Sequence, residues 1–358
     1  MIAFLQPHIP NYRQAFFEGI RNKMDTDIYC YQNREKVKNS EFVNSNIPNR
    51  SILAIENRGF LVYNPFAFLK NKYEVLVLML HIGHLTTWLL LLTKFIHKKK
   101  IILWGHGISI KRYEKEERNP SIFLKWMIGR SDGIWLYTEK EVEIWKTIFP
   151  TKKIIAINNT ISGIEHIVET KSSEKSQIKN KYNIEQSTIL IFCARFNSTH
   201  RRIDVLLETI KKLDSSKFGF IIIGQGNLKP DFSKYRNVYD FGAVYDRELK
   251  NKLFGIADIY FQPGWVGLSV VEAMAYGKPT FTFKRSQDIL QCVEYHYIQQ
   301  NVNGCIFDSF NSFLETVNTI SDEELNTLGT NGKNYAHEVL NMDNMIKSAV
   351  DLIKAVRK

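Results

Sequence analysis

The chain has 358 residues, of which 44% are apolar, and a formal net charge of +11. This length predicts about two globular domains, and the charge indicates an anionic partner such as a phosphorylated molecule, a nucleic acid or an acidic membrane. The four cysteines are far apart and form no CxxC pair, so they argue against a disulfide framework or a zinc site and favour reduced thiols in a cytosolic protein. The first twenty residues lack the pattern of a signal peptide.

Short apolar runs alternate with amphipathic stretches in the first half of the chain, which predicts a βα rhythm. The predicted strands are residues 2–5, 75–80, 101–104, 133–137 and 153–158. Thr138 and Glu141 match a capping box at the start of the helix that follows residue 137. Residues 75–96 approach the length of a membrane-spanning helix, but polar residues and glycine interrupt them near residue 83, so a strand, a turn and a short helix are expected.

A membrane role is nevertheless expected at the end of this segment. Trp88 and the four leucines at 89–92 precede a basic run, Lys98 to Lys100. Apolar and basic side chains together are typical of peripheral attachment to an anionic membrane. The protein is therefore expected in the cytoplasm, with peripheral contact at the inner face of the cell membrane.

The polar stretch from Ser162 to Ser187 predicts a domain boundary. Residues 1–162 would form the first domain, residues 163–340 the second, and residues 341–358 a C-terminal helix that packs back on the first. In the second half the βα rhythm restarts, with strands at 188–194, 218–224, 238–242, 258–262 and 280–283 and a helix at 203–213. Two such runs predict two doubly wound α/β domains facing each other across a cleft.

Basic residues follow the first strand of the second domain. Arg195 ends that strand, and Arg201 and Arg202 stand just before the next helix. Loops at the carboxyl edge of a parallel sheet bind ligands, so these side chains are candidates for a diphosphate clamp; the alternative is that they are solvated surface arginines. Gly224, in GQG, and Val244, in FGAVYD, also follow strands, where they would either approach a nucleotide or belong to ordinary turns.

One carboxylate, Glu272, lies in the apolar stretch from Pro263 to Phe283. With Ser269 it matches a capping box, in which it would only close the first helical turn. Alternatively it accepts hydrogen bonds from sugar hydroxyls while backbone amides hold phosphate oxygens. The amides in question belong to Val266, Gly267, Leu268 and Ser269. The local pattern leaves both interpretations open.

The run ADIYFQPGWVGLSVVEAMAYGKPTFTF resembles the signature of the group 1 retaining nucleotide-sugar glycosyltransferases, which have the GT-B fold of two Rossmann-like domains. Seven further segments follow the order of that family, namely HIPNYRQAFFEGI, IILWGHGI, IWLYTEKE, NNTI, CARFNSTHRRIDVLLETI, FIIIGQG and FGAVYDRELKNKLFGIADIY. The resemblance implies that Glu272 binds the ribose of the nucleotide and that Arg195 and Arg201 bind its diphosphate. The opening segment, with Tyr12 and Arg13, resembles the acceptor side of bacterial polysaccharide members.

Two positions depart from the family pattern. A glutamate that contacts the donor sugar usually stands eight residues before Glu272, where this chain has Gly264, and the glycine-rich loop of many relatives is replaced by QPHIPNYR. His106 in WGHG is the candidate for contacting the donor sugar or its transition state, although a packed, hydrogen-bonded histidine is the alternative from pattern alone.

The resemblance implies transfer of a sugar from a nucleoside-diphosphate sugar to a glycan or lipid-linked acceptor with retention, without a metal ion or other cofactor, in bacterial surface polysaccharide synthesis. An epimerase of the same fold, which needs no acceptor, is the alternative enzyme. A nucleic-acid partner is not expected, because the lysines are scattered and not interleaved with aromatic residues on one surface.

Overall fold

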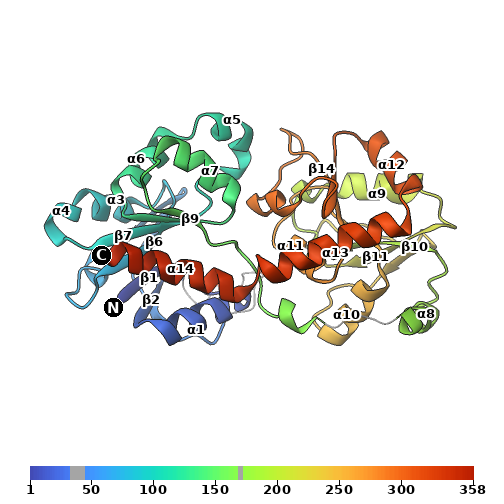
Figure 1. The fold of residues 1–358 in the computed structure, drawn as a ribbon, viewed down its shortest axis with the longest axis horizontal. Helices are drawn as coiled ribbons and strands as arrows, with labels where there is room; N and C mark the ends of the chain where they lie inside the picture. Colours follow the sequence, from blue (N-terminus) through green and yellow to red (C-terminus); the bar gives the residue numbers. More distant parts are fainter. Residues whose placement is uncertain (33–44, 168–171) are drawn as a thin grey trace. The chain divides into compact units, whose positions relative to one another are not determined.

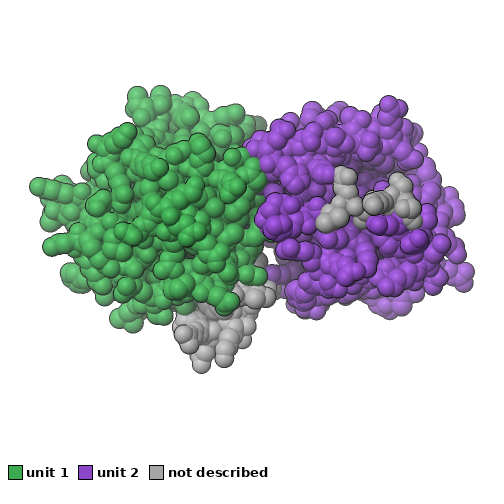
Figure 2. Space-filling view, turned by 60° about the horizontal axis from the view of Figure 1, so that its bottom comes forward, with its two compact units in different colours: residues 1–162, 341–358 green, residues 163–340 purple. Residues whose placement is uncertain are grey.

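The computed structural model describes residues 1–32, 45–167 and 172–358. The chain divides into two compact units, one formed by Met1–Ser162 with Asn341–Lys358 and the other by Gly163–Leu340 (Figure 2). Residues 168–171 of the expected interdomain connection lie outside the described residues. The helix predicted to be solvated in that segment is present as α8 (Ser172–Lys181).

The first unit is built on a parallel sheet with helices packed around it (Figure 1). Within the described residues its strand order is β3-β2-β1-β6-β7-β8-β9. The strands are β1 Ile2–Gln6, β2 Thr26–Cys30, β3 Arg50–Ser51, β6 Val75–Met79, β7 Lys100–Trp104, β8 Gly133–Leu136 and β9 Ile154–Ala156. The helices are α1 Gln14–Lys23, α3 Leu85–Leu92, α4 Lys94–His97, α5 Tyr113–Arg118, α6 Ile122–Arg130, α7 Glu139–Ile148 and α14 Met342–Arg357.

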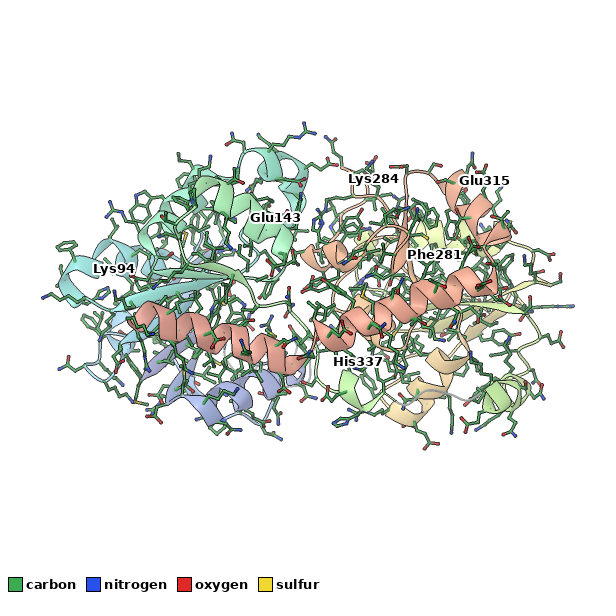
Figure 3. All side chains as sticks on the ribbon, viewed as in Figure 1. Lys94, Glu143, Phe281, Lys284, Glu315 and His337 are labelled. Atoms are coloured by element: carbon green, nitrogen blue, oxygen red, sulfur yellow. The ribbon has the colours of Figure 1, made fainter. Side chains whose placement is uncertain are left out.

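The second unit has a six-stranded parallel sheet in the order β12-β11-β10-β13-β14-β15 over the residues that are described. Its strands are β10 Thr188–Cys193, β11 Phe218–Ile223, β12 Val238–Asp240, β13 Ile259–Phe261, β14 Thr280–Phe283 and β15 Gly304–Phe307. Its other helices are α9 Ile203–Lys212, α10 Arg247–Ile256, α11 Ser269–Ala275, α12 Phe310–Thr319 and α13 Asp322–Glu338. Phe281, labelled in Figure 3, marks the buried strand β14.

Both sheets show why the central strands read as continuous apolar runs. Every residue of β1, β8 and β11 is buried, because helices cover both faces of a parallel sheet. In each sheet the strand order reverses direction once, between β1 and β6 in the first unit and between β10 and β13 in the second. Such a reversal opens a crevice at the carboxyl ends of the two strands, where doubly wound folds bind ligands.

The last helix, α14, belongs to the first unit. It contacts α1, β7, β8 and β9. Gly19 on α1 provides the necessary room, because a Cβ atom there would lie 2.2 Å from Cδ1 of Ile346. The predicted segment 75–96 divides into β6 and α3 as expected, and no helix in the described residues is both long and apolar enough to cross a bilayer.

Several local predictions were incomplete or wrong. Strands β2, β3 and β15 and the antiparallel hairpin of β4 (Ala54–Asn57) and β5 (Phe60–Tyr63) were not predicted. The capping box at α7 is not formed: Thr138 is the N-cap residue, but its hydroxyl donates to the Glu141 carboxylate and no side chain caps the backbone. Glu141 is fully buried and also accepts from the hydroxyl of Tyr113 at 2.5 Å, so these hydroxyls turn it away from the helix end.

Candidate active site

Charged side chains gather at the strand reversal of the second unit. Arg195 follows β10, Arg201 stands before α9, Lys250 lies on α10 and Glu272 on α11. The charges of both Arg201 and Lys250 act on Cys193, at the end of β10, which shows that the group lies around this strand end. Burial raises the pKa of Cys193 to about 12, so its thiol stays protonated and does not serve as a nucleophile.

The two candidate clamp arginines are brought together by the structure. Arg201 donates from Nη1 to the backbone carbonyl of Trp265 at 2.9 Å, which fixes its side chain beside the turn after β13. Burial lowers the pKa of Arg201, and the nearby positive charge of Arg195 contributes in the same direction. Because the two guanidinium groups repel each other at this edge of the sheet, an anion placed between them would relieve the repulsion and bind to both.

Arg202 does not join them. Its backbone is in the left-handed region, with φ of 54°, and its guanidinium pairs with Asp204 at 2.7 Å. This pair holds the side chain at the start of α9. Of the basic residues in this loop, Arg195 and Arg201 therefore remain the candidates for binding a diphosphate.

The capping interpretation of Glu272 is wrong. The N-cap of α11 is Leu268, no side chain caps this helix end, and the Ser269 hydroxyl donates instead to Gln262 at 3.1 Å. The Glu272 carboxylate is bound by the Lys250 ammonium, with N–O distances of 2.6 and 2.7 Å. Burial acts to lower the pKa of Lys250, but Cys193 and Glu272 outweigh it and raise that pKa overall. The Glu272 carboxylate is thus positioned by a lysine that sequence reasoning missed.

Two buried glutamines shape the turn between β13 and α11. Gln262 donates from Nε2 to the carbonyls of Gly264 at 3.1 Å and Trp265 at 2.7 Å, and its own carbonyl accepts from the hydroxyls of Tyr260 and Ser269. Gln291 accepts from the Val266 amide at 2.8 Å while donating to Phe283 and Thr282. The turn is therefore fixed before any ligand arrives.

This arrangement corrects the set of amides expected to hold phosphate. The Val266 amide is already used by Gln291. The amides of Gly267, Leu268 and Ser269 have no hydrogen-bond partner in the described part of the chain. Since α11 spans only seven residues, its dipole adds little to what these three donors offer.

Gly264, which stands where relatives carry a glutamate, is enclosed. A Cβ atom at this position would lie 2.6 Å from the backbone oxygen of His200 and 3.0 Å from Cγ of Arg202. The His200 ring stacks on Trp265, with centroids 4.9 Å apart. The loop before α9 and the turn after β13 thus meet across this glycine, and the present conformation leaves no room for a side chain.

Gly264→Glu is therefore expected to destabilise the turn by about 1–3 kcal/mol, as overpacking does, and to weaken nucleotide binding rather than restore a family contact. Gly267→Ala is the matched control, because its Cβ atom would meet only Sγ of Cys292, at 3.9 Å. Thermal melting and nucleotide titration of both variants test this expectation. A Gly264→Glu protein with wild-type melting and affinity would contradict it.

The GQG glycines are explained by contact between loops. Gly224 has φ of 147°, and a Cβ atom there would lie 2.0 Å from the carbonyl oxygen of Ala194. Gly226 approaches Asn197 and Phe196 in the same way. These glycines keep the Arg195 loop against the loop after β11. Val244 is half-buried and packs against the apolar cluster that includes Leu253 and Phe254 of α10.

In the first unit the predicted acceptor-side residues form an aromatic and cationic cluster. Arg13 is buried and lies over the Trp104 ring at 4.6 Å, and it donates to the Tyr137 hydroxyl and to Asn159, both at 3.2 Å. Burial acts to lower the pKa of Arg13, but the tyrosines Tyr137 and Tyr12 raise it overall. Arg13 is therefore a permanent positive charge, and its Nη1 has no partner in the described residues.

His106 lies next to this cluster, with its ring 4.9 Å from that of Tyr137. Although its side chain keeps contact with solvent, crowding by the surrounding protein and the charge of Arg13 lower its pKa, so the imidazole is neutral at pH 7. A pocket of about 290 Å³ opens beside it, lined in part by His81, Ser109 and Arg112. A neutral imidazole at a pocket can donate or accept a hydrogen bond, which suits contact with sugar hydroxyls.

In the part of the chain that is described, no group of three His, Cys, Asp or Glu side chains could hold a metal ion. Residues 187–322, which include the charged cluster and the turn after β13, match the family model described as glycosyl transferases group 1. This part of the second unit is therefore similar to the group 1 glycosyl transferases. The resemblance to group 1 glycosyltransferases found in the sequence is thereby confirmed for these residues.

Similarity to known proteins extends beyond these residues. A protein of Klebsiella pneumoniae, described as an uncharacterised 41.2 kDa protein in the cps region, is 23% identical over 350 residues that cover 93% of each chain. The structure of Anabaena HepE in complex with UDP has a TM-score of 0.67 at 13% identity, over 99% of each chain. The lipopolysaccharide outer core galactosyltransferase WaaB has a TM-score of 0.64 at 12% identity, over 98% of this chain and 99% of its own. These structures confirm the predicted GT-B fold.

Proposed function

We propose that this protein is a group 1 glycosyltransferase that moves a sugar from a nucleoside-diphosphate sugar to a glycan or lipid-linked acceptor, with retention, in the synthesis of a bacterial surface polysaccharide. The observation that carries the proposal is the cluster at the strand reversal of the second unit, where Lys250 binds the Glu272 carboxylate and Arg195 lies near Arg201. Cations suit the diphosphate of a donor, and a carboxylate suits its ribose hydroxyls.

Each part of this cluster would bind a different part of the nucleotide. Arg195 and Arg201 bind the diphosphate, and the free amides of Gly267 and Leu268 add hydrogen bonds. Glu272 accepts from the ribose hydroxyls, because a carboxylate has about four lone-pair positions and Lys250 occupies only part of them. Lys250 acts as a positioning residue that holds the carboxylate in place and keeps it charged.

Catalysis would follow from stabilising the departing group. As the bond between sugar and diphosphate breaks, negative charge grows on the phosphate oxygens, and the fixed guanidinium groups of Arg195 and Arg201 stabilise it. His106 contacts the donor sugar through its neutral imidazole, and Tyr12 and Arg13 serve the acceptor side. No metal ion or other cofactor is assigned a role.

The similar proteins support this assignment of substrates. HepE was crystallised with UDP and with UDP-glucose, WaaB is named as a lipopolysaccharide galactosyltransferase, and the Klebsiella relative comes from a cps region. A uridine nucleotide donor and a surface glycan acceptor are therefore the first to try. Peripheral contact of the first unit with an anionic membrane would place a lipid-linked acceptor within reach.

The test is an assay with a panel of UDP-sugars and with glycan and lipid-linked acceptors from a surface-polysaccharide pathway. We expect UDP release that requires an acceptor, persists in EDTA, and gives a product whose anomeric configuration by NMR matches that of the donor. Isomerisation of the donor sugar without an acceptor would identify an epimerase and contradict transfer. Inversion would contradict retention alone, and loss of activity in EDTA that Mg²⁺ restores would contradict metal independence.

A further inference from the structure

The first unit exposes an unusual set of large apolar side chains. Twelve of the fifteen that are exposed in the described residues lie between Leu53 and Phe123. They are Leu53, Ile55, Phe60, Val62, Phe66, Leu85, Leu89, Leu92, Phe95, Ile96, Ile122 and Phe123. Single exposed apolar residues are ordinary, but a concentration of this kind marks an interaction surface.

The hairpin of β4 and β5 has two different faces. Ile55 pairs with Val62, and Asn57 with Phe60, so these residues share one face, while Leu61 and Tyr63 point the other way into the core. The outward face therefore presents apolar side chains to solvent, with Ile55 69% and Phe60 54% exposed. Leu53, which precedes β4 and is 80% exposed, and Phe66, which follows β5 and is 74% exposed, extend this apolar stretch.

The hairpin is continuous with three helices. The Leu61 amide donates to the carbonyl of Gly83 at 2.8 Å, just before α3, and the Tyr63 amide donates to the Thr86 hydroxyl at 2.9 Å. Helix α3 in turn contacts α4 and α6, which lie beside it in Figure 1. Residues Leu85, Leu89 and Leu92 form an exposed stripe along α3, and Phe95 and Ile96 continue it on α4. We call this combined surface the apolar face.

The apolar face is embedded in a strongly basic part of the chain. Residues 51–130 contain thirteen Lys and Arg against five Glu and no Asp, a net charge of +8 out of +11 for the whole protein. Arg58 at the hairpin turn, Lys98 at the end of α4 and Arg130 on α6 are exposed. Lys94 at the start of α4, labelled in Figure 3, is half-buried and pairs with Asp132 at 2.7 Å. Among the exposed side chains of the hairpin, Glu56 is the acidic one.

This surface differs from the one expected from the sequence. Lys99 is buried and donates to the carbonyls of Lys70 and Tyr73 at 2.9 and 2.8 Å, so it does not face a membrane. Trp88 is partly buried and stacks on Trp126 with centroids 5.0 Å apart. Leu89, Leu92 and Lys98 of the predicted segment are exposed as expected, and the hairpin and α4, which the sequence prediction did not include, extend the surface.

We propose that the apolar face is a membrane-docking surface that inserts the β4–β5 hairpin and α4 into the headgroup region of an anionic lipid bilayer. Apolar side chains with lysine and arginine around them match such a bilayer. The apolar side chains can enter the acyl region, and the anionic headgroups attract the basic side chains. The net charge of +8 favours lipid over a typical protein interface, whose core is depleted of charge. The inference rests on the proposed function in one respect, since it assigns this enzyme a lipid-linked acceptor.

The experiment is flotation of the full chain with vesicles made of equal amounts of phosphatidylglycerol and phosphatidylethanolamine, and with vesicles of phosphatidylcholine alone. We expect binding to the first, weakened by salt, and little binding to the second. Ile55→Ser with Phe60→Ser should lower the partition coefficient by roughly tenfold or more, since two large apolar side chains no longer enter the bilayer. Leu228→Ser with Val302→Ser, at exposed apolar positions of the second unit, is the matched control and should bind like wild type.

Equal vesicle binding by the hairpin variant and wild type would overturn the proposal. A second result would also overturn it: wild type does not bind vesicles but forms a dimer in sedimentation velocity, and the hairpin substitutions abolish that dimer. The apolar face would then bind a second copy of the chain. Circular dichroism verifies that each variant is folded. UDP titration of the same samples separates the two hypotheses: intact UDP binding without vesicle binding overturns docking alone, and vesicle binding without UDP binding overturns the donor site alone.

Discussion

Arg201→Ala is expected to weaken UDP binding by roughly 10- to 100-fold, corresponding to the 1.5–3 kcal/mol that a hydrogen bond to a charged group contributes. Arg201 is positioned beside the turn after β13 by its bond to the carbonyl of Trp265. That carbonyl also accepts from Gln262 at 2.7 Å, so the turn remains held when the guanidinium is removed. The loss should therefore appear in nucleotide affinity, measured by isothermal titration calorimetry, more than in the melting temperature.

Arg202→Ala is the matched control for this experiment. It removes the neighbouring guanidinium, whose partner is Asp204, and should leave UDP affinity within about twofold of wild type. Arg195→Ala should resemble Arg201→Ala. Unchanged affinity in both the Arg195 and the Arg201 variants would refute the diphosphate clamp, and equal losses at Arg201 and Arg202 would show that only the total positive charge matters.

Glu272→Gln is expected to reduce both UDP affinity and transfer activity about tenfold or more. Glutamine keeps the size of the side chain but loses the charge that strengthens hydrogen bonds to ribose hydroxyls. The decisive comparison is between UDP and 2′,3′-dideoxyuridine diphosphate. Wild type should prefer UDP clearly, whereas the variant should bind the two ligands almost equally, because the preference comes from the lost carboxylate.

The matched control is Glu248→Gln on α10. Glu248 also pairs with a lysine, Lys252 at 2.5 Å, but its side chain is 76% exposed, so its replacement should change neither affinity nor stability measurably. A Glu272→Gln enzyme that retains the full preference for ribose hydroxyls would rule out the ribose role. Lys250→Met should weaken UDP binding less than Glu272→Gln does, since the lysine acts through the carboxylate.

The pair of Lys250 and Glu272 also has a pH dependence of definite sign. The folded protein raises the pKa of Lys250 above its ordinary value of 10.5. The stability that this cation contributes is fully present below that value and is lost as the pH rises through the higher pKa of the folded state. Thermal melting of Lys250→Met and wild type should therefore converge at strongly alkaline pH.

The sequence predicted the sheets well because their strands are buried on both faces. Runs such as IILW and FGFIII contain nothing but apolar residues and glycine. They are too short for a buried helix, so a buried strand is the expected element. Strand β2, TDIYC, was missed because it carries Asp27, which is buried and bound by Lys72 at 2.6 Å and by the Tyr73 hydroxyl at 2.5 Å. A polar residue with partners more than forty positions away looks like a loop residue in sequence.

The candidate site was predicted in part for a similar reason. Arg195, Arg201 and Glu272 follow strands or lie in a recognisable motif, and topology gathers them. Lys250 appears in sequence as one lysine among several on an amphipathic helix, and only the folded chain reveals its partner. The capping box at Ser269 failed because its residues met stronger partners, Gln262 for the serine and Lys250 for the glutamate.

The turn after β13, beside the proposed donor site, is held by two neutral amides, Gln262 and Gln291. Amide side chains neither gain nor lose protons across the physiological range, and added salt screens them little. The conformation of the turn should thus stay the same when pH or ionic strength changes, whereas the electrostatic interactions of the charged side chains near it should change. Changes of pH or ionic strength would tune how strongly the enzyme attracts its donor without altering the outline into which the donor must fit.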